Sequence, residues 1–574
     1  MIPNKHFQIV KHSFDNDLSN EISDNVYVDG LWPLVYILTD DKIKEAYVGE
    51  TSDAISRMSN HLKNNKKKQL TTVHFITSDV FNKSATLDIE SNLIRYLSAD
   101  TQYKLMNGNI GLANHSYYQK KEIYWEIFKN VWKDLILKGV AKNSLENINN
   151  SNLFKFSPYK SLSSDQKASL VIIMKGLMNS KVKSIIVEGG AGTGKSVLAI
   201  FLFKLLNSDD SEFDFKEFGT DEKAVIKLVR ELRKVYPNPT MALVVPMSSF
   251  RSTLKKVFKN IHGLNAKMVI GPAEVANKKF DIIIVDESHR LRQRVNLGAY
   301  FGAFDKANVK LKLDKFKSNE LAWMEMQGKK QIYFYDANQS IKPSDVNKSD
   351  FDKLKAKSGT QIQTLKSQFR VDGGNDYVAY IDKLLNCNLK TSDLEFQSQK
   401  YEFLLFHSLN DMKNKIQKRE AEFGLSRLVA GFSWEWKSNK NKEINDIEIG
   451  NIKLRWNSIS DDWVNTTKLA NEVGCIHTTQ GYDLNYTGII FGNEISYDKV
   501  KKEVIIREDQ YFDLNGKKSI KDPATLKSYI LNIYKTMMLR GIKGTYIYVC
   551  DENLREYFGE HMAIYSKTKT SVPL

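Results

Sequence analysis

Gly189-Gly190-Ala191-Gly192-Thr193-Gly194-Lys195-Ser196 is the stretch that decides the fold of this chain. Apolar runs precede it at residues 184–187 and follow it at residues 197–202, so the sequence predicts a strand, a glycine loop and a helix. Gly189, Gly192 and Gly194 let backbone N–H groups turn toward a triphosphate, beside a positive charge from Lys195. The Ser196 hydroxyl can ligate Mg²⁺. The pattern therefore predicts binding and hydrolysis of a nucleoside triphosphate, with ATP and Mg²⁺ as cofactors.

A second apolar run, Phe280–Val285, ends in two acids. Behind such a loop in the same sheet, Asp286 is expected to hold the Mg²⁺ shell and Glu287 to polarise the attacking water. Short apolar runs alternate with helical patterns along the rest of the chain, at 185–187, 242–245, 282–285, 331–335, 403–406, 428–431, 488–491 and 545–549. This alternation predicts two parallel-sheet α/β domains.

Four later motifs follow in a fixed order. They contain Gln339, Arg370 in Leu365–Arg370, Gly481 in His477–Asp483, and Arg540 in Met538–Gly541. The ordered set resembles the motifs of superfamily 1 helicases. The resemblance implies two RecA-like domains, a γ-phosphate sensor at Gln339, Gly481 among the nucleotide-binding residues, and finger arginines at Arg370 and Arg540 supplied by the second domain.

The resemblance is looser at four places. Leu162–Gln166 resembles an adenine-reading motif with Gln166 as the reader, although a helix N-cap followed by a surface glutamine is the alternative. Val245–Arg251 occupies the place of the first strand-contacting motif, and a surface loop is the alternative there. Leu539 stands where the family usually has Thr, and Asp483 where Glu is commoner. These departures bear on unwinding more than on hydrolysis.

A different set of residues lies near the N-terminus. Tyr36 lies in Leu34–Leu38, Tyr47 in Ala46–Thr51, and Glu90 in Leu87–Ile94, with Arg57 and His61 between them. The set resembles GIY-YIG nucleases, with Leu34 in place of the first motif glycine. The resemblance implies two motif tyrosines, a single metal-binding glutamate at Glu90, and a final asparagine at Asn107 or Asn109.

The chemistry of that set is coherent. Arg57 and His61 are four residues apart, so they share one helix face, and Arg57 can stabilise a pentavalent phosphorane. Glu90 can hold one Mg²⁺, or Mn²⁺, and Tyr36 or Tyr47 can relay a proton with help from His61. Four lysines that can contact phosphates follow directly: Lys63, Lys66, Lys67 and Lys68. The alternatives are a half-buried hairpin with aromatic strand residues, and an inactive copy of the nuclease.

The fold class expected from these patterns is α/β. A small α+β GIY-YIG domain at 1–142 is followed by an Asn-rich linker at 143–156 and by RecA-like domains at 157–345 and 346–574, with insertions at 208–239 and 434–463. The chain of 574 residues has no apolar run long enough for a membrane span. Three scattered cysteines form no metal or disulfide pattern, which favours a reducing cytoplasm.

The net charge of +16 favours a polyanion partner, although a lysine-rich proteome would give the same excess. Nucleic acid is the expected partner, DNA rather than RNA. Oligomeric state and partner proteins cannot be read from the sequence. The whole chain resembles bacterial fusions of a GIY-YIG nuclease with a Schlafen-type superfamily 1 helicase-like ATPase. The hypothesis is an ATP-dependent DNA nuclease and translocase in antiphage defence, restriction or DNA repair. The alternatives are an ATP-gated switch with a nucleic-acid docking N-terminal domain, and an RNA-directed helicase or nuclease.

Overall fold

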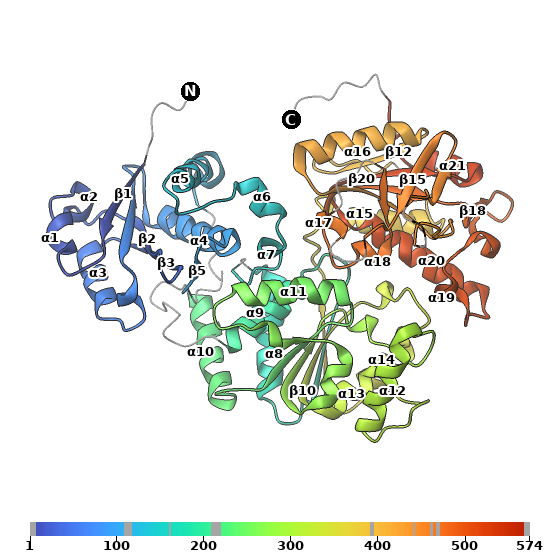
Figure 1. Ribbon diagram of the computed structural model, residues 1–574, viewed down its shortest axis with the longest axis horizontal. Coiled ribbons are helices and arrows are strands. Elements are labelled where there is room, and N and C mark those ends of the chain that lie inside the picture. Colours follow the sequence, from blue (N-terminus) through green and yellow to red (C-terminus); the bar gives the residue numbers. More distant parts are fainter. Residues whose placement is uncertain are drawn as a thin grey trace. The chain divides into compact units, whose positions relative to one another are not determined.

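The computed structural model describes residues 7–107, 117–159, 162–207, 220–390, 395–439, 441, 443–459, 463–466 and 471–566. Figure 1 shows the helices and strands along the chain. The chain divides into two compact units. The first comprises residues 1–178, 196–239 and 254–269, and the second comprises residues 179–195, 240–253 and 270–574. No helix among the described residues is long and apolar enough to cross a bilayer.

The N-terminal part of the first unit is built on a five-stranded sheet in the order β1-β4-β2-β3-β5. All its pairs are antiparallel except β3 with β5. The strands are β1 (Gln8–Ser13), β2 (Leu34–Asp40), β3 (Glu45–Thr51), β4 (Thr72–Thr77) and β5 (Lys104–Leu105). β2 and β3 form a hairpin in which Tyr36 lies opposite Gly49 and Leu38 opposite Tyr47.

Alternation along these strands gives the sheet two apolar faces. Val35, Ile37 and Val48 pack into a core with α4 (Lys83–Asp100) and α5 (Trp125–Leu137). Tyr36, Leu38 and Tyr47 pack into a second core on the opposite face. That core is completed by α1 (Leu18–Ile22), α2 (Val26–Asp29) and α3 (Ala54–Leu62). The two motif tyrosines therefore face α3.

Residues 143–156 are folded, which corrects the expectation of a linker. They form α6 (Leu145–Asn150) and α7 (Asn152–Lys155), each started by a serine cap. Leu145, Ile148 and Phe154 are buried in the same core as α4 and α5. A polar, Asn-rich composition concealed three apolar positions that are spaced for burial on short helices.

The first unit also contains α8 (Ser164–Met178), α10 (Thr220–Val235) and most of α9 (Lys195–Leu206). Most of α11 (Ser248–Asn260) belongs to it as well, and the rings of Phe203 and Phe258 pack edge to face at 5.3 Å. Of the charged insertion at 208–239, residues 208–219 lie outside the described residues.

The second unit begins with a six-stranded sheet in the order β11-β6-β10-β9-β7-β8, parallel from β11 to β7. Its strands are β6 (Ser184–Gly189), β7 (Met241–Val244), β8 (Val269–Ile270), β9 (Phe280–Val285), β10 (Gly328–Tyr335) and β11 (Thr360–Leu365). The four strands predicted for this domain are confirmed. Three helices, α12 (Phe301–Lys310), α13 (Glu320–Gln327) and α14 (Lys348–Lys355), share one core with the sheet. We call this part the first lobe. Because α14 and β11 belong to it, the first lobe extends to residue 365, which corrects the expected domain boundary at residue 345.

The second lobe has a seven-stranded sheet in the order β12-β20-β17-β13-β16-β15-β14. Its strands are β12 (Glu402–Phe406), β13 (Ser426–Ala430), β14 (Ile447–Ile449), β15 (Ile452–Trp456), β16 (Glu472–Gly474), β17 (Leu484–Phe491) and β20 (Gly541–Val549). The four predicted strands are again confirmed. The segment 434–463, expected as a separate excursion, instead adds β14 and β15 to the edge of this sheet.

The main helices of the second lobe pack into one large core, to which the short α18 (Ile476–Thr479) adds Ile476. These main helices are α15 (Gly374–Leu385), α16 (Leu409–Phe423), α20 (Pro523–Met538) and α21 (Glu552–Gly559). The short α17 (Trp463–Thr466) packs instead in a smaller cluster with Tyr482 and Leu484, and a further short helix is α19 (Leu514–Lys517). A hairpin of β18 (Ile495–Asp498) and β19 (Glu503–Ile506) stands apart from the main sheet. The fold is thus a mixed α+β domain followed by two parallel-sheet α/β lobes, as predicted.

Candidate functional site

The glycine loop joins the end of β6 to the start of α9. Gly192 and Gly194 have φ of +83° and +79°, a backbone conformation that glycine adopts readily. The Lys195 ammonium donates to the carbonyl oxygens of Gly189 at 2.6 Å and Gly190 at 2.9 Å. Lys195 is therefore buried and held over the loop by backbone carbonyls.

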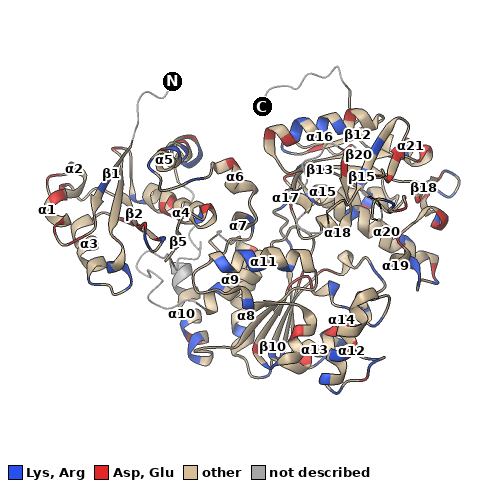
Figure 2. Ribbon diagram, in the orientation of Figure 1, with Lys and Arg blue, Asp and Glu red and all other residues tan. Residues whose placement is uncertain are grey.

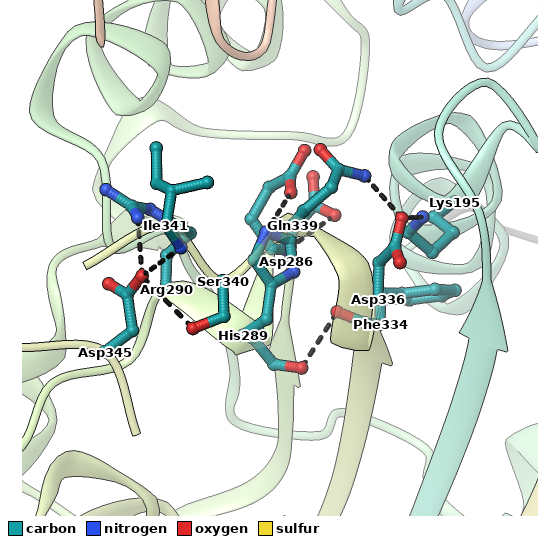
Figure 3. Close-up of polar contacts among 12 residues, drawn as sticks. Lys195, Asp286, His289, Arg290, Phe334, Asp336, Gln339, Ser340, Ile341 and Asp345 are labelled. Atoms are coloured by element: carbon teal, nitrogen blue, oxygen red, sulfur yellow. Dashed lines mark hydrogen bonds and ion pairs between the residues drawn. The ribbon is translucent and has the colours of Figure 1, made fainter. Parts of the chain in front are cut away.

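Asp336, at the end of β10, lies between Lys195 and Gln339, the residue predicted to sense the γ-phosphate (Figure 3). Its Oδ2 accepts a hydrogen bond of 2.6 Å from Gln339 Nε2 and lies 3.9 Å from Lys195 Nζ. A role was predicted from the sequence for Gln339 but not for Asp336. The available signal was an acid at the end of a parallel strand, which is also the pattern that indicated Asp286.

The paired acids follow β9 as predicted. Ser288 Oγ donates to the Phe334 carbonyl oxygen at 2.8 Å, which joins the ends of β9 and β10 (Figure 3). Glu287 has a left-handed φ of +51°, and its Oε2 lies 3.2 Å from His289 Nε2 without a hydrogen bond. Burial lowers the pKa of His289 to about 3, so this imidazole is neutral and does not form an ion pair with Glu287.

A second buried network, which the sequence did not reveal, fixes the segment after Gln339. Asp345 Oδ2 accepts from Arg290 Nη1 at 2.6 Å and from the backbone N–H groups of Ile341 at 3.0 Å and Lys342 at 3.1 Å (Figure 3). Because Arg290 follows the paired acids closely, this network ties the β9 end to the segment that carries Gln339. An arginine and an aspartate 55 residues apart leave no local sequence signal.

The second lobe supplies both predicted finger arginines to this place. The Phe369 N–H donates to the Gly192 carbonyl oxygen at 2.9 Å, which sets the loop that bears Arg370 against the glycine loop. Arg540 is 1% exposed, and its Nη2 lies 3.5 Å from Gln339 Oε1. Burial and the nearby Arg370 lower the pKa of Arg540 to about 10, whereas Glu287 and two aspartates act in the opposite direction.

Asp483 forms an ion pair with one of the predicted finger arginines. Its Oδ1 lies 2.5 Å from Arg370 Nε. The neighbouring Gly481 has φ of +90°, and a Cβ there would meet the Phe250 ring at 3.0 Å. The Tyr482 hydroxyl and Thr253 Oγ1 are 3.0 Å apart. This segment of the second lobe therefore packs on the start of α11.

Residues 245–251 do not form the surface loop that was the alternative reading. Ser248 begins α11, Phe250 is fully buried, and Arg251 Nη1 donates to the Val245 carbonyl oxygen at 2.7 Å. Arg251 therefore fastens the end of β7 to the helix, a structural task that the sequence did not indicate.

Gln166 and Ser196 lie in the first compact unit. Gln166 Oε1 accepts from the Ser163 N–H at 3.0 Å, and Ser163 Oγ accepts from the Gln166 N–H at 3.1 Å. Ser163 and Gln166 therefore form a capping box at the start of α8, which agrees with the alternative that this segment is a helix N-cap. Gln166 is buried, however, and not on the surface as that alternative expected. Ser196 lies in the first turn of α9, next to Lys195 in the chain.

The N-terminal cluster is centred on the Tyr36 hydroxyl. Arg57 Nε donates to Tyr36 Oη at 3.0 Å, and Tyr36 Oη and His61 Nε2 are 2.7 Å apart. Arg57 and His61 therefore share one face of α3, as predicted, and Asp53 caps that helix. Burial lowers the pKa of His61 to about 2, with help from Lys67 and Arg57, so His61 is neutral and its Nε2 can accept a hydrogen bond from the Tyr36 hydroxyl.

Burial, together with Tyr47 and Glu90, raises the pKa of Tyr36 well above its usual value, and Arg57 opposes the shift. The Tyr36 phenol lies over Gly49, where a Cβ would stand 2.2 Å from Oη and 2.3 Å from Cζ. A glycine is therefore needed directly opposite Tyr36 in the hairpin.

The second tyrosine completes an aromatic and cationic wall. The Tyr47 ring meets the His61 ring edge to face at 5.2 Å, and Lys67 Nζ lies 3.4 Å from the Tyr47 ring centroid. Among the lysines that follow α3, Lys67 thus reaches this cluster, a contact that sequence spacing did not specify.

Glu90 projects from α4 and is buried, and its charge acts on Tyr36. Within the described part of the chain, no group of three or more His, Cys, Asp or Glu side chains is placed to hold a metal. A single carboxylate suits an ion that takes most of its shell from water and phosphate oxygens, which is the habit of Mg²⁺.

Asn107 has a structural role. Its Oδ1 accepts from the Val48 N–H at 2.9 Å, and its Nδ2 donates to the Val48 carbonyl oxygen at 2.7 Å. The side chain thus pins β3 between the motif residues Tyr47 and Gly49. The rival Asn109 lies outside the described residues.

Charge is distributed unevenly over the helices (Figure 2). α10 and α11 carry Lys and Arg in excess, whereas α16 carries both signs. Basic helices of this kind are the electrostatic signature of a polyanion partner.

Comparisons with known proteins agree with these two centres. Residues 182–551 match the Schlafen group 3, DNA/RNA helicase domain, and residues 33–104 match the GIY-YIG catalytic domain. The Saccharomyces cerevisiae protein YPL245W is 24% identical over 396 residues, which cover 65% of this chain and 82% of its own length.

The chain also has similarity to solved structures of two proteins, Pif1 helicase and Mss116p. The Pif1 helicase from Bacteroides, with ADP-AlF3 and ssDNA, is 11% identical with a TM-score of 0.26, over 67% of this chain and 92% of its own. Mss116p, with ssRNA and AMP-PNP, is 14% identical with a TM-score of 0.29, over 76% of this chain and 80% of its own. By the family match over most of its length, the chain belongs to the Schlafen group 3 DNA/RNA helicase family, with a GIY-YIG catalytic domain ahead of the helicase domain.

Proposed function

We propose that the protein is an ATP-dependent DNA nuclease and translocase that acts on foreign DNA, in antiphage defence or restriction, or in DNA repair. The observation that carries the proposal is the meeting of Arg370 and Arg540 from the second lobe with the glycine loop and Gln339 of the first. An ATPase whose site is completed by a second lobe can convert hydrolysis into relative movement of the lobes.

In the ATPase centre, Lys195, Ser196 and Asp286 would hold the nucleotide with its Mg²⁺. Two observations support the fit of these residues to a bound nucleotide with Mg²⁺. Glu287 Oε2 is buried without a hydrogen bond among the described residues, and Gly192 and Gly194 have left-handed backbone conformations that open the loop. The bound ion would supply neutralisation of charge on the phosphates. Glu287 orients the attacking water, and the two arginines stabilise charge on the transferred phosphoryl group.

In the nuclease centre, Glu90 would hold one divalent ion, which supplies Lewis-acid polarisation of the phosphodiester. Tyr36 is the preferred proton relay over Tyr47, because its hydroxyl is already paired with the neutral His61 Nε2. The Arg57 guanidinium, anchored through Nε on Tyr36, faces the developing negative charge of the phosphorane.

Cleavage of end-labelled strands by the full chain tests the proposal. Single-stranded DNA, duplex DNA and RNA of one sequence are incubated with Mg²⁺, with and without ATP. We expect DNA cutting by the parent, no cutting by Glu90→Ala, and normal DNA-stimulated ATP hydrolysis by Glu90→Ala. Lys195→Ala is expected to lose hydrolysis and any stimulation of cutting by ATP.

The matched controls separate the alternatives. Asp88→Ala alters a neighbouring acid of α4 that pairs with Lys120 at 2.8 Å, and it should cut DNA normally. Cutting of RNA alone would assign the enzyme to RNA. Failure of the parent to cut any strand, with hydrolysis that DNA does not stimulate, would favour the ATP-gated switch with a docking N-terminal domain.

A further inference from the structure

A recess of about 730 Å³ lies at the amino ends of three strands of the first lobe, β6, β10 and β11. The glycine loop lies at the opposite, carboxyl end of β6. Six residues of strand separate the two ends, which corresponds to about 20 Å. The recess is therefore distinct from the nucleotide centre. Its described lining includes Lys181, Lys183, Lys329, Gln331, Lys357 and Thr360.

The lining is strongly basic, with four lysines and one glutamate. Lys357 pairs with Glu325 at 2.5 Å, and Lys329 pairs with Asp281 at 2.8 Å. Throughout the described residues, no carboxylate lies within 4.0 Å of the ammonium of Lys181 or Lys183. Both side chains are exposed, so their ammonium groups are accessible to an anion that enters the recess.

The backbone that carries these two lysines is fixed. Lys330 Nζ donates to the carbonyl oxygens of Asn179, at 2.6 Å, and of Val182. The Gly359 carbonyl oxygen accepts from the Lys183 N–H at 2.8 Å. Gly359 has φ of +110°, and a Cβ there would stand 2.9 Å from the Lys181 carbonyl oxygen. Both walls of the recess are therefore preorganised, which lowers the entropy lost on binding a ligand.

The side chains that line the recess indicate which class of ligand it can bind. The described lining has no aromatic side chain on which a base could stack, and it offers ammonium, hydroxyl and amide donors. Its volume lies in the range of small-molecule sites. We propose that this recess is a second anion site, which binds a compact ligand bearing several phosphates and recognises those phosphates rather than a base.

Calorimetric titration with inorganic tripolyphosphate tests the proposal. The full chain carries Lys195→Ala, so that the loop lysine contributes nothing to the signal. Adding Lys181→Ala and Lys183→Ala should weaken binding about fivefold for each lysine removed, because an ion pair about 4 Å apart in water contributes about that factor. Lys181→Arg with Lys183→Arg should restore most of the affinity. Lys306→Ala with Lys310→Ala, on exposed positions of α12, is the matched control and should change nothing.

Two outcomes would overturn the proposal. One is unchanged tripolyphosphate affinity in the double alanine variant with an unchanged circular dichroism spectrum. The other outcome has two parts: the parent does not bind tripolyphosphate, and the double alanine variant binds a 30-nucleotide DNA strand more weakly than the parent. That result would make the recess part of a nucleic-acid surface.

Discussion

Gly49→Ala is expected to disable the nuclease centre because the new methyl group would displace the Tyr36 side chain. The new Cβ would stand 2.2 Å from Tyr36 Oη and 2.3 Å from Cζ. Carbon atoms in contact are normally about 3.5–4.0 Å apart, so the ring must shift by more than about 1 Å. Tyr36 is fully buried, and its hydroxyl bonds Arg57 and His61.

The magnitude follows from two contributions. Overpacking a buried position costs about 1–3 kcal/mol. Displacing the hydroxyl breaks its hydrogen bond with the Arg57 guanidinium, and bonds to charged groups contribute about 1.5–3 kcal/mol. The free energy of unfolding of the N-terminal domain should therefore fall by about 2.5–6 kcal/mol, the sum of those two ranges. Cutting should be lost even at temperatures where the domain remains folded.

Differential scanning calorimetry of the full chain, together with strand cleavage, measures both effects. Gly302→Ala is the control, because nothing lies within 4 Å of a Cβ at that helical position. Tyr36→Phe keeps the ring and removes the hydroxyl, so Gly49→Ala should destabilise that background less than it destabilises the parent. Parental unfolding temperature and parental cutting by Gly49→Ala would refute this account of the hairpin.

Three further predictions concern single groups. Arg370→Ala and Arg540→Ala should each slow ATP hydrolysis at least about a hundredfold with nucleotide binding retained, and parental turnover would argue against the finger roles. Glu287→Gln should bind ATP but hydrolyse it slowly in single-turnover assays, whereas a parallel loss of affinity would contradict its role toward water. Because the pKa of folded His61 is about 2 and that of a free histidine about 6.5, protonation favours the unfolded state between these values. The urea midpoint of the parent should therefore fall relative to His61→Asn as the pH drops below 6.5, and parallel pH profiles would exclude the buried neutral imidazole.

Local patterns predicted the strands that carry the catalytic motifs. The apolar runs before Gly189 and Asp286 are β6 and β9, and the four-residue spacing of Arg57 and His61 does place both on the Tyr36 hydroxyl. These predictions succeeded because burial on both faces of a parallel strand, and one face of a helix, leave a signal within a few residues.

Sequence reasoning failed where the signal was weak or non-local. β11 was missed because it is an edge strand whose polar Gln361 and Gln363 interrupt the apolar pattern. α6 and α7 were read as a linker because Asn residues dominate their composition. The Arg290–Asp345 pair and the Val48–Asn107 bonds join residues more than 50 positions apart, and no local pattern reports such contacts.

The burial of Arg540 connects the architecture of the helicase domain to its chemistry. A guanidinium withdrawn from water loses several kcal/mol of hydration, and nearby opposite charges must compensate for that loss. The acids that act on Arg540 come from both lobes: Glu287 and Asp336 from the first, and Asp483 from the second. Neither lobe alone provides this environment, so the stable position of the finger depends on contact between the lobes. A triphosphate bound at Lys195 would add negative charge beside Asp336 and compete with these acids for the same guanidinium. Binding of a triphosphate at the glycine loop would therefore change the electrostatic attraction between Arg540 and the acids of the two lobes, and with it the stability of the contact between the lobes.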